Sequence, residues 1–286
     1  MKTLIYLLVF FFSLSSCVKN NPDPSWIKVN KWSLITNLNA TSPQGVLTES
    51  FTDAYVFVDG KMMGIFEVPF KIPLLKSGSV NIKIYPVIKN NGISATKKIY
   101  PFMSPYDLNV VLEKNKTLEI NPVTNYVSAT QFWIEDFEDA TIKIENDVDS
   151  KVQIHSDDNP SVLKFGNYCG KITLNASDSL WLGRTTSGLK LPIGKEVYLE
   201  IDYHNTNSLE TGLVVVTTTG VTDNRNILIN KQAAETVQWK KIYIDLKELV
   251  SYSSTATSHE ISFKALFDAG LPSSDIYIDN IKIVHF

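Results

Sequence analysis

Residues 197–204 carry polar side chains that could bind a sugar. Apolar and polar residues alternate there, as in a β-strand with one buried face, and Glu200, Asp202 and His204 share the polar face. Carboxylate and imidazole groups hydrogen-bond to hydroxyl groups, and Asn205 adds a planar amide to the set. The polar face of this strand is therefore predicted to be open to solvent or to a ligand.

A sugar site also needs a flat aromatic ring that packs on the apolar face of a pyranose. Trp181 is a candidate, since small residues and the cation Arg184 lie close to it in the sequence. Leucines flank this tryptophan on both sides, however, and such a tryptophan is more often a core residue. Both interpretations of Trp181 stay open, whereas Trp133 and Trp239 lie within apolar strands and are predicted to be core residues.

The sequence shows no recognisable catalytic arrangement. Four carboxylates cluster at residues 135–139, but neighbours on a strand point to opposite faces and cannot all converge on one glycosidic bond. The four histidines show no metal-ligand spacing, and there is no nucleophile elbow or Gly-rich phosphate loop. The sequence therefore favours binding over catalysis.

The composition predicts two folded domains. The chain has 286 residues, of which 44% are hydrophobic and 20% are charged, enough apolar surface for packed cores. Lys and Arg number 27 against 30 for Asp and Glu, which gives a net charge of -3. Without a basic excess to neutralise phosphates, nucleic acid is not an expected partner.

The amino terminus predicts export. Lys2 precedes a run of eleven almost entirely apolar residues at 4–14, too short to span a bilayer and typical of a signal peptide. The following Leu-Ser-Ser-Cys, which ends at Cys17, resembles the bacterial lipobox. The resemblance implies that residues 1–16 are a signal peptide and that Cys17 is lipidated. An ordinary signal peptide with an incidental cysteine is the alternative.

A lipidated Cys17 would attach the mature chain to a membrane, since acyl chains contribute about 0.8 kcal/mol per buried methylene. Residues 17–24 are polar and carry Pro22 and Pro24, as in an extended tether. We expect an outer-membrane lipoprotein, with its periplasmic or surface face left open. The second cysteine, Cys169, then has no partner for a disulfide and is predicted to be a buried, inert thiol.

Residues 25–125 are predicted to form an antiparallel β-sandwich. Short alternating runs are separated by turn signals, of which Asp59-Gly60 and Asn91-Gly92 are the clearest. The segment that ends at Asp59-Gly60, with Gly64 and Pro69 after it, resembles PEGA-like β-modules, which implies a spacer or interaction platform. The stretch from Trp26 to Pro122 is also similar to the first half of uncharacterised Bacteroidota lipoproteins.

Residues 131–286 are predicted to form a second β-domain, which makes the protein all-β. Its opening Asp-Phe-Glu at 136–138, its middle segment 239–246 and its closing segment 275–283 resemble non-catalytic jelly rolls of the galactose-binding-like and carbohydrate-binding-module type. The resemblance implies that the first and last strands are neighbours. It also implies a structural calcium ion held by Glu138 and Asp279. Two solvated carboxylates, or side chains bonded to turn amides, are the alternative.

The leading hypothesis is a membrane-anchored lipoprotein of the bacterial cell envelope whose jelly roll binds a glycan or another envelope component. A structural lipoprotein that docks to an outer-membrane protein partner is the second hypothesis. An unrecognised polysaccharide-degrading enzyme is the third.

Overall fold

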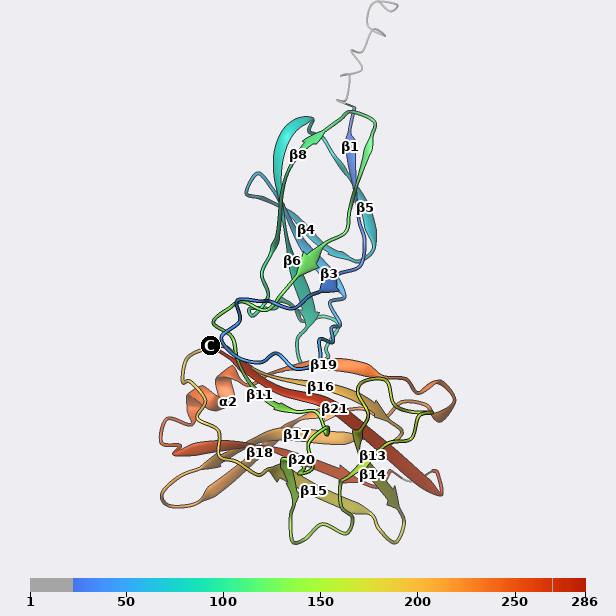
Figure 1. The fold of residues 1–286 in the computed structure, drawn as a ribbon, viewed down its shortest axis with the longest axis vertical. Helices are drawn as coiled ribbons and strands as arrows, with labels where there is room; N and C mark the ends of the chain where they lie inside the picture. Colours follow the sequence, from blue (N-terminus) through green and yellow to red (C-terminus); the bar gives the residue numbers. More distant parts are fainter. Residues whose placement is uncertain (1–22, 269) are drawn as a thin grey trace, which may run out of the picture.

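The protein is seen in a computed structural model that describes residues 23–268 and 270–286. The predicted signal peptide at 1–16, the lipidation site Cys17 and most of the tether lie outside the described residues. The fold is all-β, as predicted, with a slender N-terminal unit, strands β1–β10, standing on a jelly roll, strands β11–β21 (Figure 1). None of the helices in the described ranges has the length and apolar character needed to cross a bilayer.

The N-terminal unit is a sandwich of short strands. Its larger sheet has the order β4-β3-β6-β7, with β8 paired to β6, and a smaller sheet has the order β5-β1-β9. The strands are β1 (Ser25–Val29), β2 (Ser33–Leu34), β3 (Asp53–Val58), β4 (Lys61–Glu67), β5 (Phe70–Leu74), β6 (Gly78–Lys89), β7 (Lys97–Ile99), β8 (Tyr106–Leu112), β9 (Thr117–Ile120) and β10 (Val123–Thr124).

The turn signals of this unit are confirmed. Asp59 and Gly60 connect β3 to β4 with φ angles of 48° and 74°, and Asn91 and Gly92 adopt 54° and 73°. Most strand pairs of the sandwich are antiparallel, as predicted, but β1 pairs with β9, and β2 with β10, in parallel. Parallel strands are joined by long crossover connections. Short turn motifs, which depend on neighbouring residues, do not indicate such pairing between distant strands.

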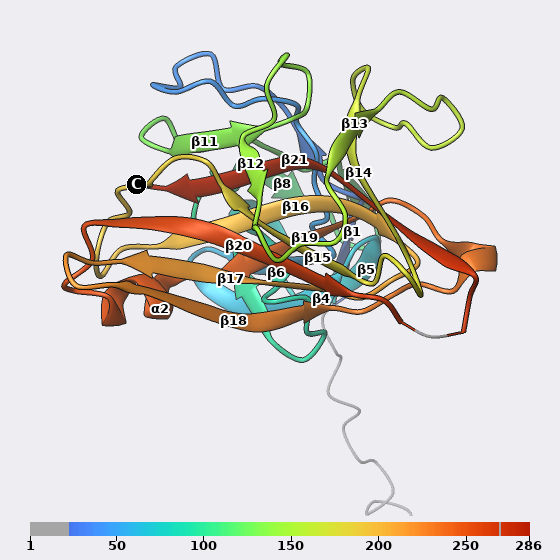
Figure 2. The same ribbon diagram turned by 90° about the horizontal axis from the view of Figure 1, so that it is seen from below.

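The jelly roll consists of two packed sheets (Figure 2). The first has the order β13-β14-β21-β16-β19, with β11 also paired to β21, and the second has the order β12-β15-β20-β17-β18. The elements are β11 (Gln131–Glu135), β12 (Ile144–Asn146), β13 (His155–Asp157), β14 (Cys169–Asn175), β15 (Leu180–Thr185), β16 (Val197–Asn205), β17 (Leu209–Val216), β18 (Val221–Ile229), η1 (Ala234–Thr236), β19 (Lys240–Asp245), α2 (Lys247–Tyr252), β20 (Ser258–Leu266) and β21 (Ser273–His285).

Two features of the jelly roll agree with the sequence. The first and last strands, β11 and β21, are antiparallel neighbours. Cys169 is a fully buried free thiol, and burial raises its pKa to about 12, which fits an inert cysteine. The apolar side chains between the two sheets form one continuous core.

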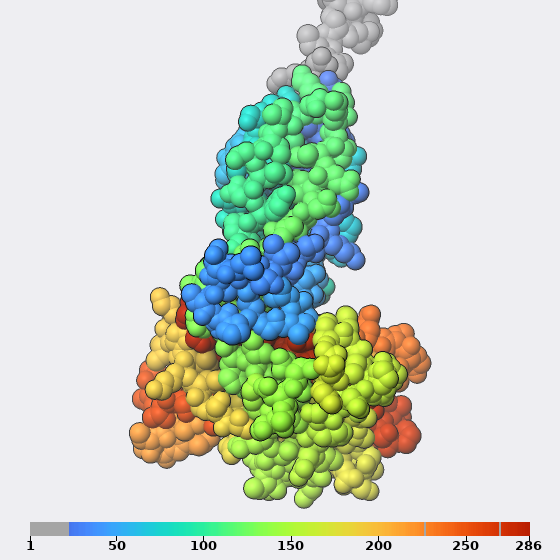
Figure 3. All heavy atoms as spheres, viewed as in Figure 1, coloured from blue at the N-terminus to red at the C-terminus, as the bar shows by residue number. Residues whose placement is uncertain are grey.

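The N-terminal unit rests on the outer face of the first jelly-roll sheet. Its core continues into the jelly roll, since Tyr198, Tyr243 and Val284 pack with it rather than between the jelly-roll sheets. The space-filling view shows the segment that precedes β3, in blue, at the waist between the two units (Figure 3). This contact decides which side chains of β16 and β19 are open to solvent.

Candidate functional site

The polar row of β16 lies beneath the N-terminal unit. Glu200 is fully buried and accepts hydrogen bonds from the hydroxyls of Tyr100, at 2.5 Å, and Tyr126, at 2.9 and 3.0 Å. Asp202 is also buried and accepts a 2.6 Å bond from the hydroxyl of Thr48. The prediction that this face is open was therefore wrong for Glu200 and Asp202, because tyrosine and threonine residues of the other unit cover them.

A buried lysine lies close to both of these carboxylates. The ammonium of Lys241 lies 2.9 Å from Glu200 and 3.9 Å from Asp202, and it also donates to Thr48 at 2.9 Å. Burial alone would raise the pKa of Glu200, but the charges of Lys241 and Lys282 and the hydrogen bonds hold it below its usual value. Glu200 is thus an ionised carboxylate that joins the two units, not a ligand-binding group.

A second buried lysine fastens one loop of the N-terminal unit to the jelly roll. The ammonium of Lys282 on β21 donates to the backbone carbonyls of Gln44 and Val46, both at 2.6 Å. Residues 47–52 follow directly and reach β3. The two bonds therefore set the position of this loop over the jelly-roll sheet.

A turn of the N-terminal unit docks beside the loop. Asn91 donates from its backbone amide to the carbonyl of Tyr243 at 2.9 Å, and its side chain accepts from the amide of Asp245 at 2.8 Å. Asn90 and Tyr243 thereby form an isolated parallel β-bridge between this turn and β19. The loop 47–52 and the 89–94 turn therefore both lie against the first jelly-roll sheet.

The other predicted site residues are dispersed. Asn205 is fully buried and its amide donates to the carbonyls of Asn207 and Asn230, so it holds the end of β16 rather than a ligand. His204 is half-buried, with its ring 5.9 Å from that of Trp239 and 5.6 Å from that of Tyr277. Of the predicted residues, only His204 and Asp202 border open space near Trp239.

Trp181 is a core residue, so its predicted role as a sugar platform was wrong. Its side chain has 0% exposure, stacks on Phe263 at 5.9 Å and donates to Asn146 at 2.9 Å between the two sheets. Arg184 lies on the outer face of the second sheet, where it pairs with Glu145 at 2.8 Å and Glu260 at 3.8 Å. The structure therefore does not bring Trp181, Arg184 and the β16 row into one site.

The outer face of the second sheet is poorly suited to sugar. Its five strands contain only two residues with Phe, Tyr or Trp rings, Trp181 and Phe263, and both are buried. Its hollow has a volume of about 150 Å³, and the charged side chains around it, such as Arg225 and Asp223, pair with each other. No aromatic ring is available there for stacking.

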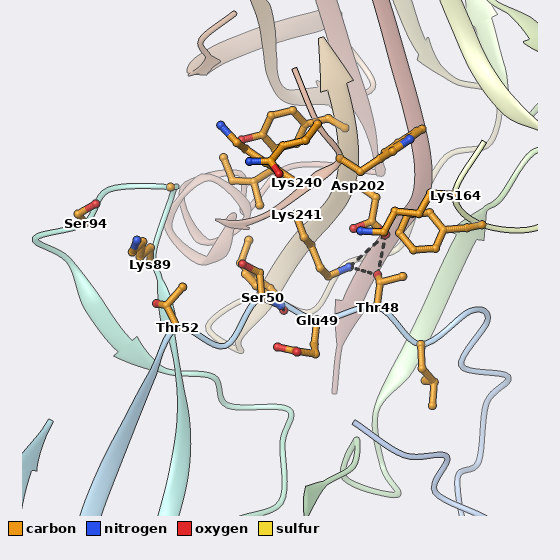
Figure 4. A pocket seen from close by; sticks show the side chains of 18 residues that line it. Thr48, Glu49, Ser50, Thr52, Lys89, Ser94, Lys164, Asp202, Lys240 and Lys241 are labelled. Carbon is orange, nitrogen blue, oxygen red and sulfur yellow. Dashed lines mark hydrogen bonds and ion pairs between the residues drawn. The ribbon is translucent and has the colours of Figure 1, made fainter. Parts of the chain in front are cut away.

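A large hollow lies at the junction of the two units (Figure 4). This junction cleft has a volume of about 700 Å³, within the range of about 300–1,000 Å³ usual for ligand sites. Its lining comes from both units: Leu47, Thr48, Glu49, Ser50, Thr52, Lys89, Gly92 and Ser94 from the N-terminal unit, and Lys164, Phe165, Asp202, Tyr203, Gln238, Trp239, Lys240, Lys241, Ile242 and Tyr243 from the jelly roll.

Aromatic rings line the jelly-roll side of the cleft. Trp239 is half-buried, and its indole N–H donates to the carbonyl of Val162 at 2.7 Å, which fixes the ring. Phe165 meets it edge-on at 5.8 Å. The prediction that Trp239 is a core residue is wrong, because Trp239 lies just before β19 in a segment that borders the cleft. Its polar neighbours, Gln238 and Lys240, are the sequence signal that could have indicated exposure.

Three lysines reach the cleft without a carboxylate partner. Lys89 ends β6, Lys164 lies in the loop before β14, and Lys240 begins β19; Figure 4 shows them on different sides of the cleft. None of them forms an ion pair within residues 23–268 and 270–286. The cleft therefore combines ring faces with free cations.

Glu138 and Asp279 do not form a ready calcium site. Both oxygens of Glu138 accept amide hydrogen bonds, from the backbone and side chain of Asn167 at 2.6 and 2.9 Å and from Tyr168 at 3.0 Å. In the described part of the chain, no group of three His, Cys, Asp or Glu side chains is arranged to hold a metal. This arrangement does not supply the 6–8 oxygens that calcium takes, and calcium binding stays a prediction.

The comparisons with known proteins report structural similarity alone. No protein-family model matches the sequence, and the search of curated proteins gives no match. Among solved structures, the CBM22-1 and GH10 modules of Clostridium thermocellum endo-1,4-β-D-xylanase 10B, complexed with xylohexaose, match 54% of this chain and 28% of that chain, at 17% identity and a TM-score of 0.38.

Two separate carbohydrate-binding modules are also similar. A mutant of CBM29-2 covers 55% of this chain and 85% of the module, at 12% identity and a TM-score of 0.34. TmCBM61 in complex with β-1,4-galactotriose covers 49% of this chain and 85% of the module, at 15% identity and a TM-score of 0.31. Similarities at these TM-scores carry no argument about the ligand, so function has to be argued from the cleft itself.

Proposed function

We propose that this chain is a non-catalytic, glycan-binding lipoprotein of the bacterial cell envelope, and that the junction cleft is its binding site. The observation that carries the proposal is the half-buried ring of Trp239, held at the edge of a cleft of about 700 Å³ among polar side chains. A pyranose ring would pack its apolar face on this indole, since sugar sites combine a flat ring with a few orienting polar groups.

Hydrogen-bonding groups surround the indole on both walls. Gln238 and Lys240 flank it on the jelly-roll side, and Ser50 and Ser94 face the cleft from the N-terminal unit. Amide, ammonium and hydroxyl groups can each bond to sugar hydroxyls. The site therefore offers a stacking surface and several hydrogen-bonding groups, and both units contribute side chains to it.

The state of the carboxylates supports binding rather than cleavage. Glycoside hydrolysis generally uses two carboxyl groups on either side of the scissile bond. Of the two that line the cleft, Asp202 is buried and engaged with Thr48, and Lys241 lies beneath it. That leaves Glu49 as the single carboxylate in the cleft lining with no lysine bound to it.

The membrane anchor is a separate part of the proposal. Lipidation of Cys17 would attach the chain just before β1, which begins at Ser25 at the end of the N-terminal unit remote from the jelly roll (Figure 1). The N-terminal unit would then act as a spacer, as its PEGA-like pattern implies. A Cys17→Ala variant is expected to leave the membrane fraction of cells; retention of this variant would contradict lipid anchoring.

Glycan binding is tested with the lipid-free chain 25–286 on an array of host, plant and bacterial glycans, followed by calorimetry. We expect Trp239→Ala to abolish binding with little change in melting temperature. Trp26→Ala is the matched control, because Trp26 is also partly exposed and has Lys71 5.0 Å from its ring, but lies on β1 away from the cleft. Silence across the array, or equal losses in both variants, would refute the proposal.

One observation favours docking to an outer-membrane protein partner as a second candidate. Strand β4 lies at the edge of its sheet and exposes the apolar side chains of Met62, Met63 and Ile65. An unpaired edge with exposed apolar residues is a template for strand addition. Cross-linking in membranes should then capture an outer-membrane protein with the native chain, and Met62→Lys with Ile65→Lys should abolish its capture.

A further inference from the structure

The charges in the junction cleft differ from those of the chain as a whole. The protein has a net charge of -3, yet three lysines without ion-pair partners, Lys89, Lys164 and Lys240, converge on one hollow. The lining of the cleft has four lysines, with Lys241, against two carboxylates, Glu49 and Asp202, so the lysines are in excess. Asp202 is already matched by Lys241, and Glu49 accepts a bond from the amide of Phe51 at 2.6 Å.

Two smaller hollows share lining residues with the cleft. One, of about 460 Å³, shares Gln238 and Lys240 and adds Lys231 and Gln232. The other, of about 340 Å³, shares Lys164, Gln238 and Trp239 and adds His204. The three hollows together follow the segment around Trp239, with lysines along their length. This shape fits several consecutive sugar units better than one.

From these two observations we propose that the junction cleft binds an acidic polysaccharide, with Lys89, Lys164 and Lys240 facing anionic groups on successive sugars while Trp239 stacks on a ring. The assignment of an acidic ligand rests on the proposed function and makes it more specific. Lysine ammonium groups are compact point charges and pair with a uronate carboxylate or a sulfate ester alike. The shared chemistry is therefore a repeated negative charge on a sugar chain.

Lys241 adds a fourth ammonium group to the lining of the cleft. Of its two carboxylate partners, Asp202 also lines the cleft and Glu200 does not. Desolvation by burial raises the pKa of Glu49, while the hydrogen bond from the Phe51 amide and the charge of Lys241 act in the opposite direction. Fields between exposed charges fall off within about 8 Å at physiological ionic strength, so the three lysines act locally and their effect depends on salt.

The test uses the lipid-free chain 25–286 in calorimetry and affinity electrophoresis. Polygalacturonate, a sulfated galactan and a neutral galactan are compared, and fully methyl-esterified polygalacturonate is the matched control because it keeps the backbone and removes the charge. The triple variant K89Q/K164Q/K240Q is compared with K61Q/K114Q/K190Q, three lysines that are exposed elsewhere and give the same change in net charge.

We expect at least one anionic polymer to bind, and its affinity to fall at least about tenfold in the cleft triple variant, since one exposed ion pair accounts for up to about fivefold. The control triple variant should bind as the native chain does, and raised salt should weaken binding. Preference for polygalacturonate assigns carboxylates as the charged groups, and preference for the sulfated galactan assigns sulfates.

Binding of neutral and esterified polymers as tightly as charged ones, with Trp239→Ala still abolishing it, would overturn the acidic-ligand proposal but leave glycan binding intact. Equal binding of polyphosphate would overturn it as well, because the site would then recognise charge without sugar. No binding to any polymer would overturn both proposals.

Discussion

Replacing Glu200 with alanine removes the central group of the contact between the two units. Its carboxylate is paired with Lys241 at 2.9 Å and accepts hydrogen bonds from Tyr100 and Tyr126, and the ion pair has side-chain exposures of 2% and 0%. The substitution leaves the buried ammonium of Lys241 with a single, more distant counter-charge, the carboxylate of Asp202 at 3.9 Å. It also leaves two tyrosine hydroxyls short of an acceptor.

The expected loss of stability follows from these contacts. Breaking a buried ion pair by removing one partner costs about 3–5 kcal/mol, and each orphaned hydroxyl adds about 1 kcal/mol or more. We therefore expect Glu200→Ala to lower the free energy of unfolding by about 5 kcal/mol. For a chain of this size that lowers the melting temperature by about 10–20 °C.

Chemical denaturation and calorimetry of the lipid-free chain measure this loss. Glu119→Ala is the control, because Glu119 also lies 2.9 Å from a lysine, Lys28, but this pair is exposed, so its removal should change the stability little. The double variant Glu200→Leu/Lys241→Met should recover most of the stability, since apolar side chains can replace a buried pair. A loss below about 1 kcal/mol in Glu200→Ala would refute the reasoning.

The same pair predicts a dependence on acid. Because the folded-state pKa of Glu200 lies below its unfolded value of about 4.3, its contribution is present above that pH and is lost as the pH falls through the folded pKa. The native chain should therefore lose stability more steeply than Glu200→Ala in strong acid. Parallel curves for the two proteins would contradict this assignment.

Three further predictions concern the jelly roll. Burial and neighbouring carboxylates raise the pKa of Asp279 to about 8. Above about pH 4 the unfolded chain releases this proton while the folded chain keeps it. The free energy of unfolding therefore falls as the pH rises from about 4 to about 8. Asp279→Asn should therefore raise the melting temperature at pH 8.5 much more than at pH 5; equal effects would count against the shift. Gly212→Ala should lower the free energy of unfolding, measured by chemical denaturation, by about 3 kcal/mol, because the new Cβ would lie 2.0 Å from the Asn224 carbonyl oxygen. Gly220→Ala is the control, since a Cβ at Gly220 meets nothing within 4 Å. If calcium binds at Glu138 and Asp279, added calcium should raise the melting temperature and Glu138→Gln should abolish the rise. A melting curve that neither calcium nor chelator changes would contradict calcium binding.

Local patterns in the sequence predicted the strands and several turns. Alternation located β16, and Asp59-Gly60 located the β3–β4 hairpin, because both signals depend on neighbours in the chain. The cover over Glu200 could not be predicted in this way. Its partners Tyr100, Tyr126 and Lys241 are far away in sequence, and a polar side chain on an alternating strand looks the same whether water or a tyrosine faces it.

The candidate site was missed for a related reason. The cleft exists only where the loop 47–52 and the 89–94 turn meet β19, so its position follows from the docking of two units rather than from any one motif. The side chain of Trp239 is partly exposed because the N-terminal unit does not extend over it. For Trp181, in contrast, the flanking leucines were informative, and the structure agrees with the core interpretation.

The bonds from Lys282 to the loop before the cleft have a consequence for specificity. Both acceptors are main-chain carbonyls, of Gln44 and Val46. These hydrogen bonds therefore do not depend on which side chains the loop carries. Substitutions at Glu49 or Ser50 would therefore present new groups to a bound polymer while the scaffold keeps its shape. If the cleft binds glycans as proposed, exchange of this short loop is a direct route to variants that select different saccharides from one unaltered framework.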